Sequence, residues 1–436
     1  MTKARLDGLQ LVLLGSALFV LAGFVASRVT FTGLIYFRQL YCASRSLIEH
    51  HDPYNPDQLR SAYQAHFHDL PPDPAKVEWL SSALSHCPNL PTTFLVLAPF
   101  ALLPGNLADA LWMLVTAGSI VLASYLIWNV EAERAPRLSA LFIFLLLVNS
   151  EMLLSLGNTA GSVVGLCVIA VWCFLRDRFA LAGILCLALS LVMKPQDGGF
   201  VWLYFLLAGG LARKRALQTL AVAALIALPA VLWISHFVPH WLAELHAILA
   251  AMYSRGGLDD PGPQSGGALG VNMIVSLQTI FSRIYDESAF YNPAAYLICA
   301  IPIVIWVRKS LRSRYSTIGA WYALAAIVPF TLLVVYHRCY DCRLLMLTVP
   351  ACIDLWLTRS PVRWWALALT VAGITVTGDL LWIAVFHFTG YSHSSLEAAM
   401  IPAPVALAAL GVFYMWTYIK HGDASAPSAA AAKTAV

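Results

Sequence analysis

The chain contains a series of apolar runs, most of them close to the length that a helix needs to cross a lipid bilayer. A span takes about 20 apolar residues, and backbone groups inside the bilayer must satisfy their hydrogen bonds within a helix or a closed barrel. Only 11% of the 436 residues are charged, whereas soluble domains average about 25%. The sequence therefore predicts an all-α, polytopic membrane protein with about twelve transmembrane helices. They are expected near residues 9–28, 107–128, 138–154, 160–176, 179–193, 198–212, 216–237, 293–307, 317–336, 343–358, 363–386 and 398–420.

The short connections between these runs alternate between basic and non-basic. If the N-terminus is inside, the cytoplasmic segments hold 17 of the 27 Lys and Arg residues. Short cytoplasmic loops carry this excess in membrane proteins. We therefore predict a cytoplasmic N-terminus (residues 1–8), a membrane domain (residues 9–420) and a cytoplasmic tail (residues 421–436), which its Ala-rich composition predicts to be disordered.

This orientation places the polar motifs on one side of the membrane. Residues 29–91 and 238–292 become long extracytoplasmic loops, and the polar helix ends near 155–158, 194–197 and 337–341 lie on the same side. Random scatter would distribute such motifs over both faces. The shared face predicts one shared site.

The first loop contains a stretch with helical spacing of its apolar residues, 37–48. Arg38 and Arg45 fall on another face, which predicts an interfacial amphipathic helix whose basic residues either hold a lipid phosphate or are solvated. The motif HDPYNP at residues 51–56 combines two turn signals and is equally typical of a plain helix stop. The apolar run 92–103 is too short to cross and predicts a re-entrant or interfacial helix.

A second motif, Lys194-Pro195-Gln196, ends a span with a cation on the side where cations are scarce. A phosphate-bearing lipid substrate would explain the charge, and snorkelling at a helix end is the alternative. Acidic residues at membrane depth carry the same ambiguity between function and pairing with Arg. They are Asp109, Glu151, Asp354 and Asp379.

The densest group of reactive side chains is the segment 336–343, YHRCYDCR. His337 is an acid or base, Arg338 can bind phosphate, and Asp341 can act as a base or orient a sugar hydroxyl. Its CxxC is half of a zinc site with no second half in the sequence, so we predict no metal and no cofactor. In the Gly-rich loop 255–272, the adjacent pair Asp259-Asp260 is only a weak metal signal, and the loop is either a substrate gate or a disordered connector.

Together these motifs resemble bacterial glycosyltransferase family 87, whose members use polyprenyl-phosphate sugars and have the GT-C fold. The resembling segments are YFRQLYCASRSLIEHHDPYNP (36–56), PTTFLVLAPFALLP (91–104), LGN (156–158), MKPQ (193–196) and YHRCYDCRLL (336–345). The resemblance implies a GT-C-like bundle in the bacterial inner membrane. It also implies inverting transfer of a hexose, mannose-like, from a polyprenyl-phosphate donor to a lipid or glycan acceptor on the extracytoplasmic face.

Candidate site residues follow from the motifs and the resemblance together. The catalytic candidates are His337, Asp341, Asp52 and Glu49. The candidates for substrate binding are Tyr36, Arg38, Tyr41, Arg45, Tyr54, Asn158, Lys194, Gln196, Arg338 and Tyr340. Tyr36 stands where the family has an acid, and a tyrosine is a weak base at neutral pH.

Two other functions stay open at this stage. A transporter or flippase would have a similar hydropathy, although the chain shows no internal repeat and its long first loop is untypical of that layout. A catalytically silent relative is the other alternative, because Tyr36 replaces the acid. The chain has no P-loop or dinucleotide fingerprint, which suits a lipid donor and a non-enzyme alike.

Overall fold

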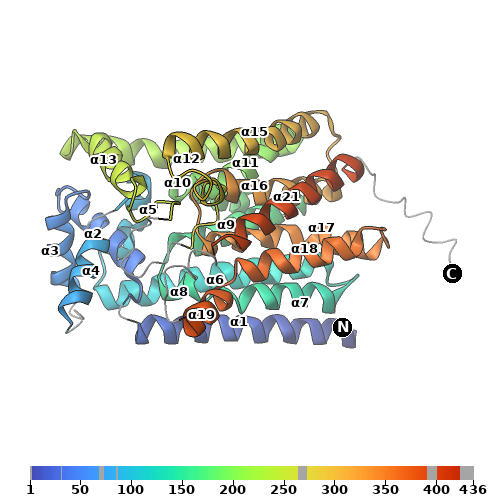
Figure 1. Ribbon diagram of the computed structural model, residues 1–436, viewed down its shortest axis with the longest axis horizontal. Coiled ribbons are helices and arrows are strands. Elements are labelled where there is room, and N and C mark those ends of the chain that lie inside the picture. Colours follow the sequence, from blue (N-terminus) through green and yellow to red (C-terminus); the bar gives the residue numbers. More distant parts are fainter. Residues whose placement is uncertain are drawn as a thin grey trace.

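The computed structural model describes residues 2–30, 32–67, 73–84, 87–263, 273–389 and 400–422. These residues form an elongated bundle of helices that run mostly along its long axis (Figure 1). Among them, the only β-structure is an isolated antiparallel bridge between Ile274 and Arg338. The predicted all-α class is confirmed for the described part of the chain.

Six helices are long and apolar enough to cross a membrane. They are α1 (Lys3–Val29), α6 (Gly105–Glu131), α12 (Gly210–Phe237), α15 (Ser288–Arg312), α16 (Thr317–Val334) and α21 (Pro402–His421). A seventh span results if α18 (Arg363–Val376) and α19 (Asp379–Thr389) are counted as one broken helix, bent by 56°. The shorter apolar helices are α5 (Pro91–Ala101), α7 (Pro136–Leu147), α9 (Thr159–Leu175), α10 (Ala180–Met193) and α13 (Trp241–Tyr253). Of these, α7, α9 and α10 cover parts of three other predicted spans, whereas α5 covers most of the predicted re-entrant segment 92–103 and α13 lies in the predicted loop 238–292, so the count of about twelve stays a prediction.

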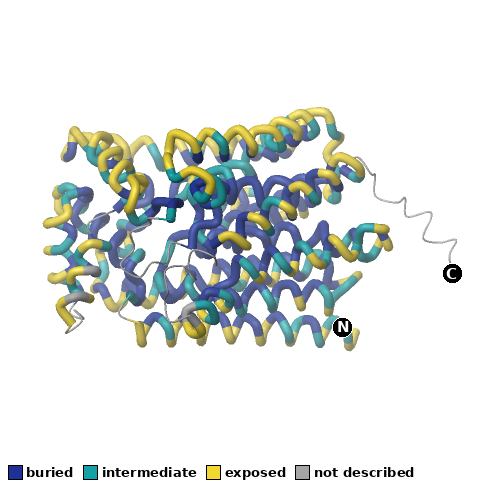
Figure 2. Tube along the Cα trace, viewed as in Figure 1, coloured by how far each residue is buried: buried dark blue, intermediate teal, exposed yellow. Residues whose placement is uncertain are grey.

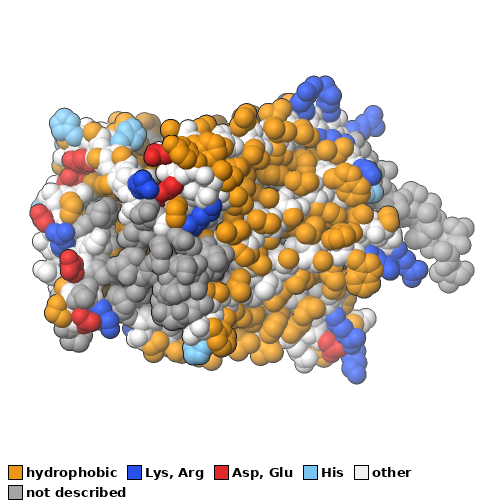
Figure 3. All heavy atoms as spheres, viewed as in Figure 1, with side chains coloured by type: hydrophobic (Ala, Val, Ile, Leu, Met, Phe, Trp, Pro, Cys, Tyr) orange, Lys and Arg blue, Asp and Glu red, His pale blue; other side chains and the backbone are white. Residues whose placement is uncertain are grey.

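The centre of the bundle is α16, which is buried along nearly its whole length and packs against α21, α15 and α11 (Pro195–Leu207). In contrast, α12 and α15 lie at the edge of the bundle, where much of their trace is exposed (Figure 2). Their exposed large apolar side chains include Leu225 and Leu297. Such side chains form a continuous apolar area on the face seen in Figure 3. An apolar exterior over a well-packed interior suits a bundle surrounded by lipid.

The predicted helix of the first loop is present as α2 (Ile35–Ile48). It is buried on most sides, since it packs against α5, α3 (Pro56–His66) and α4 (Pro74–Leu84) instead of lying free on a surface. Asn55 caps α3 by accepting hydrogen bonds from two backbone N–H groups, and Pro56 occupies the first helical turn. The HDPYNP motif therefore starts a helix after the turn.

Three helix breaks bring polar residues together in the interior. The first separates α7, α8 (Glu151–Ser155) and α9, and the second separates α10 from α11. The third follows α16, where the 3₁₀ helix η1 (Cys339–Thr348) leads into α17 (Val349–Leu357). Because α9 contacts both α11 and η1, the three breaks are neighbours in space.

Candidate functional site

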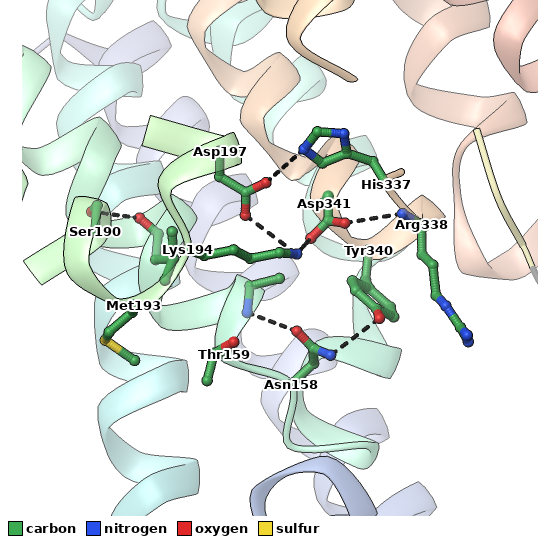
Figure 4. Close-up of polar contacts among 12 residues, drawn as sticks. Asn158, Thr159, Ser190, Met193, Lys194, Asp197, His337, Arg338, Tyr340 and Asp341 are labelled. Carbon is green, nitrogen blue, oxygen red and sulfur yellow. Dashed lines mark hydrogen bonds and ion pairs between the residues drawn. The ribbon is translucent and has the colours of Figure 1, made fainter. Parts of the chain in front are cut away.

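Lys194 lies at the break between α10 and α11, where Pro195 begins the new helix. Proline has no N–H to donate and is well tolerated in the first turn, so the chain changes direction at this lysine. The ammonium group contacts Asp341 and lies 3.4 Å from Asp197 (Figure 4). Its side chain is 14% exposed, whereas those of both aspartates are almost completely buried. Lys194 is therefore the member of this group that can reach a ligand.

His337 lies behind Lys194 and is completely buried. Its Nε2 is 3.0 Å from Asp197 Oδ1, and its Nδ1 is 3.0 Å from the carbonyl oxygen of Val335. A carbonyl oxygen only accepts, so Nδ1 carries a proton, and Nε2 faces a carboxylate. Neither nitrogen therefore presents a free lone pair toward a substrate in this arrangement.

Asp341 is held from two sides. One carboxylate oxygen contacts Lys194, and the other accepts a hydrogen bond of 2.9 Å from the backbone N–H of Arg338, which closes the first turn of η1. Burial raises the pKa of Asp341, although Lys194 opposes this shift. Burial acts in the same direction on Asp197, but Lys194 and His337 outweigh it and hold the pKa of Asp197 below its usual value.

The ring of Tyr340 lies beside this group and links it to α9. The Lys194 ammonium is 5.5 Å from the ring centroid, within the range of a cation–π contact. Asn158 caps α9 through its Oδ1 and donates from Nδ2 to the Tyr340 hydroxyl, at 3.1 Å. Asn158, Tyr340 and Lys194 are thus linked in one group by contacts between their side chains.

Arg338 forms a second group, on the other side of Tyr340. Its side chain extends away from Lys194 (Figure 4) and donates to the hydroxyl of Tyr36 at 3.0 Å and to Asp259 at 2.8 Å. It also donates to the hydroxyl of Tyr336. The rings of Tyr36 and Tyr340 meet edge to face, with centroids 6.3 Å apart. The structure therefore brings Tyr36, Arg338 and Tyr340 together with the Lys194 group.

Several predicted binding residues are engaged in contacts within the protein. Arg38 is buried, makes an ion pair of 2.9 Å with Asp109 and lies over the ring of Phe67. The other three bind backbone carbonyl groups or a neighbouring side chain. Arg45 pairs with Glu49 and donates to Ala101, Tyr41 donates to Leu103, and Tyr54 donates to Asn89.

The predicted catalytic residues fall in two separate places. His337 and Asp341 lie beside Lys194, whereas Glu49 and Asp52 follow the C-terminal end of α2. Tyr36 lies at the opposite end of this 14-residue helix, and a helix of that length spans about 20 Å. Gln196 is half-buried in the first turn of α11. The predicted catalytic residues therefore form two sets: His337 and Asp341 lie in the Lys194 group, and Glu49 and Asp52 lie at the far end of α2 from Tyr36.

Two further residues of the site were not predicted from the sequence as site residues. Asp197 was visible only as the acid three positions after Lys194, a spacing that places both on one side of the first turn of α11. In the sequence, Asp259 is only half of a weak metal signal, the pair Asp259-Asp260. Its true partner, Arg338, is distant in sequence, and no local pattern reveals that contact.

The remaining charged groups do not add a metal site. Within the described ranges, no cluster of three His, Cys, Asp or Glu side chains is arranged to hold a metal ion. Elsewhere, the buried Arg343 donates to the backbone of Asn149 and Thr377, which joins η1 to the breaks near α8 and α18. This arginine has a structural role in the described part of the protein.

These features define a helical membrane protein with a buried charged site that reaches its surface through Lys194. The model of glycosyltransferase family 87 matches residues 90–335, which is more than half of the chain. The protein therefore belongs to glycosyltransferase family 87, as the sequence motifs predicted. No match was found among curated proteins or among solved structures. The matched region contains Asn158 and Lys194 and ends two positions before His337.

Proposed function

We propose that the protein is a membrane glycosyltransferase that transfers a hexose, mannose-like, from a polyprenyl-phosphate sugar to a lipid or glycan acceptor, with inversion at the anomeric carbon. The family supports glycosyl transfer in general. The geometry around Lys194 is the observation that carries the choice of a lipid-phosphate donor. A partly exposed cation next to an aromatic ring, inside a bundle with an apolar exterior, suits a ligand with a phosphate, a sugar and a lipid chain.

The Lys194 ammonium has three N–H donors. Two of them face Asp197 and Asp341, so the third is left to bind a phosphate oxygen of the donor. Because both aspartates are fixed in position by His337 and by the backbone of Arg338, they fix the direction of that third N–H. We assign His337 and Asp341 as positioning residues that act through Lys194.

The step needs a cation where negative charge develops. As the sugar–phosphate bond breaks, charge accumulates on the leaving polyprenyl phosphate, and Lys194 stabilises it more strongly in the transition state than in the ground state. Asn158 and Tyr340 border the same surface and are assigned to sugar or phosphate binding. Gln196 is assigned to the same role because it lies within one helical turn of Lys194.

The site is proposed to face the extracytoplasmic side of the bacterial inner membrane. The described N-terminus and the end of α21 lie at one end of the bundle, and α2 to α4 lie at the other (Figure 1). Lys and Arg side chains gather at the first end (Figure 3), which supports a cytoplasmic location for it by the positive-inside rule.

Transfer can be tested with membranes that contain the protein and matched membranes that lack it. Each is given radiolabelled sugar on polyprenyl phosphate or on a nucleoside diphosphate, with a lipid extract as acceptor. Protein-dependent transfer from the lipid donor that is lost in Lys194→Met supports the proposal. Transfer from the nucleotide donor alone would contradict the donor class. If no donor supports transfer but a labelled lipid or solute moves across the membrane, the protein is a transporter instead.

A further inference from the structure

Asp259 lies at the edge of the site, beside Arg338, and its carboxylate has no role in the proposed function. It lies in the loop after α13, where its backbone N–H bonds to the carbonyl oxygen of Met252. The adjacent Asp260 accepts hydrogen bonds from the backbone of Gly256 and Gly262 and so holds the loop in shape. Asp259 is thereby left to point at Arg338, with Oδ1 2.8 Å from the guanidinium.

The other carboxylates of the site are already occupied. Asp197 is completely buried between Lys194 and His337, and Asp341 has one oxygen on Lys194 and the other on a backbone N–H. Among the described residues, the hydrogen bond from Arg338 reaches Asp259 at Oδ1, and the Asp259 side chain is 4% exposed. Asp259 therefore lies beside Arg338 and Tyr36 with Oδ1 bound to the guanidinium, which leaves Oδ2 for another ligand.

We propose that Asp259 is the general base that deprotonates the acceptor hydroxyl, an inference that rests on the proposed glycosyl transfer. Arg338 orients the carboxylate through Oδ1 and leaves Oδ2 to face the acceptor. Tyr340 separates this base from Lys194, so the acceptor and the donor phosphate approach the sugar from different sides. That separation is what an in-line displacement with inversion requires.

Atoms and charge balance in this step. Asp259 Oδ2 takes the proton of the acceptor hydroxyl, and the acceptor oxygen forms its bond to the anomeric carbon. The bond from that carbon to the phosphate oxygen breaks, and its electron pair leaves with the polyprenyl phosphate beside Lys194. The products are the glycosylated acceptor, polyprenyl phosphate and a protonated Asp259, which returns its proton to water. The step needs no oxidant, reductant or further reactant.

The hydroxyl of Tyr36 provides a way to test the position of the base. Tyr36 and Asp259 bind neighbouring nitrogens of the same guanidinium, so a carboxylate introduced at position 36 would lie close to the same acceptor. A carboxylate at position 36 should therefore partly replace the Asp259 carboxylate when Asp259 is changed to Ala.

The experiment measures initial rates of sugar transfer for purified protein in lipid vesicles, with polyprenyl-phosphate sugar as donor. Asp259→Ala should reduce kcat about 10²- to 10⁴-fold, as expected for loss of a general base. Formate added to Asp259→Ala should raise its kcat at least tenfold. Separately, the double variant Tyr36→Asp/Asp259→Ala should have a kcat at least tenfold above that of Asp259→Ala. The matched control is Asp286→Asn, an acid near the same loop that pairs with Arg255 at 3.0 Å and should keep wild-type rates.

Loss of loop structure would give a different result. If Asp259 only anchored the loop through Arg338, neither formate nor the acid at position 36 would restore activity, and the assignment would be overturned. An active wild type with an equally active Asp259→Ala variant would overturn this inference alone. A wild type that transfers no sugar from any lipid donor would overturn the proposed function as well.

Discussion

Lys194→Met keeps the apolar stem but removes the ammonium that lies between two buried carboxylates. At 3.4 Å from Asp197 and with an effective dielectric constant of about 20, each such attraction amounts to about 5 kcal/mol before desolvation. Removing one partner of a buried ion pair typically destabilises a protein by about 3–5 kcal/mol. We expect Lys194→Met to lower the free energy of unfolding by that amount.

The loss should be partly reversed by removing one of the negative charges. In Lys194→Met/Asp341→Asn, only Asp197 and His337 remain as an ionisable pair, and the amide oxygen introduced at position 341 can still accept from the backbone of Arg338. The double variant should be more stable than Lys194→Met, with a coupling of about 1–3 kcal/mol. Activity should stay lost in both variants, since neither has the ammonium that binds phosphate.

Unfolding can be followed through the cysteines. All nine are free thiols and eight of them are buried, so a thiol-reactive dye labels them mainly in the unfolded protein. The measurement is the SDS mole fraction at which labelling begins, in mixed micelles. If the destabilisations of Lys194→Met and Asp341→Asn simply added in the double variant, Lys194 would not be balancing Asp341. The reasoning for the oriented N–H would then be wrong.

Three further predictions concern residues outside this group. Asp109→Asn should lower stability by about 3 kcal/mol, because it leaves Arg38 buried without its charged partner, and should leave the KM for the donor unchanged in the transfer assay. Gly157→Ala should cost about 1–2 kcal/mol in the same SDS titration, because Gly157 has φ +65° and an added Cβ would also crowd its neighbours. Burial and the adjacent Asp52 raise the pKa of Glu244, so its folded form binds a proton more tightly than its unfolded form. The stability that protonated Glu244 contributes is therefore fully present below the unfolded pKa of about 4.5 and is lost as the pH rises through the pKa of the folded protein. Glu244→Gln should flatten that part of the plot of unfolding free energy against pH.

Helix formation and the polar helix ends could be predicted because they depend on local sequence. The spacing of apolar residues in 37–48 predicted α2, and Pro195 predicted the break that exposes Lys194. The number of membrane spans was harder to predict from the sequence, because a short apolar run has the same composition whether it crosses the bilayer or ends inside the bundle. Helices such as α9 and α10 show this, since both are apolar and shorter than an average span.

The contacts of individual charged residues were harder to predict from the sequence than the helices. Arg38 and Lys194 are both basic residues near helix ends on the same predicted face. Only the structure shows that Arg38 is fully paired with Asp109, whereas Lys194 keeps part of its surface exposed. His337 is reactive in isolation, but the neighbouring carbonyl and carboxylate leave it no free lone pair.

The sequence by itself determined that this protein is a helical membrane protein of glycosyltransferase family 87, because hydropathy and short motifs are local properties of the chain. The tertiary structure decided which charges meet. Lys194 with Asp341, Asp197 with His337, and Arg338 with Asp259 are all pairs from segments far apart in the sequence. Burial decides whether such a charge needs a partner, and burial arises only when the helices pack.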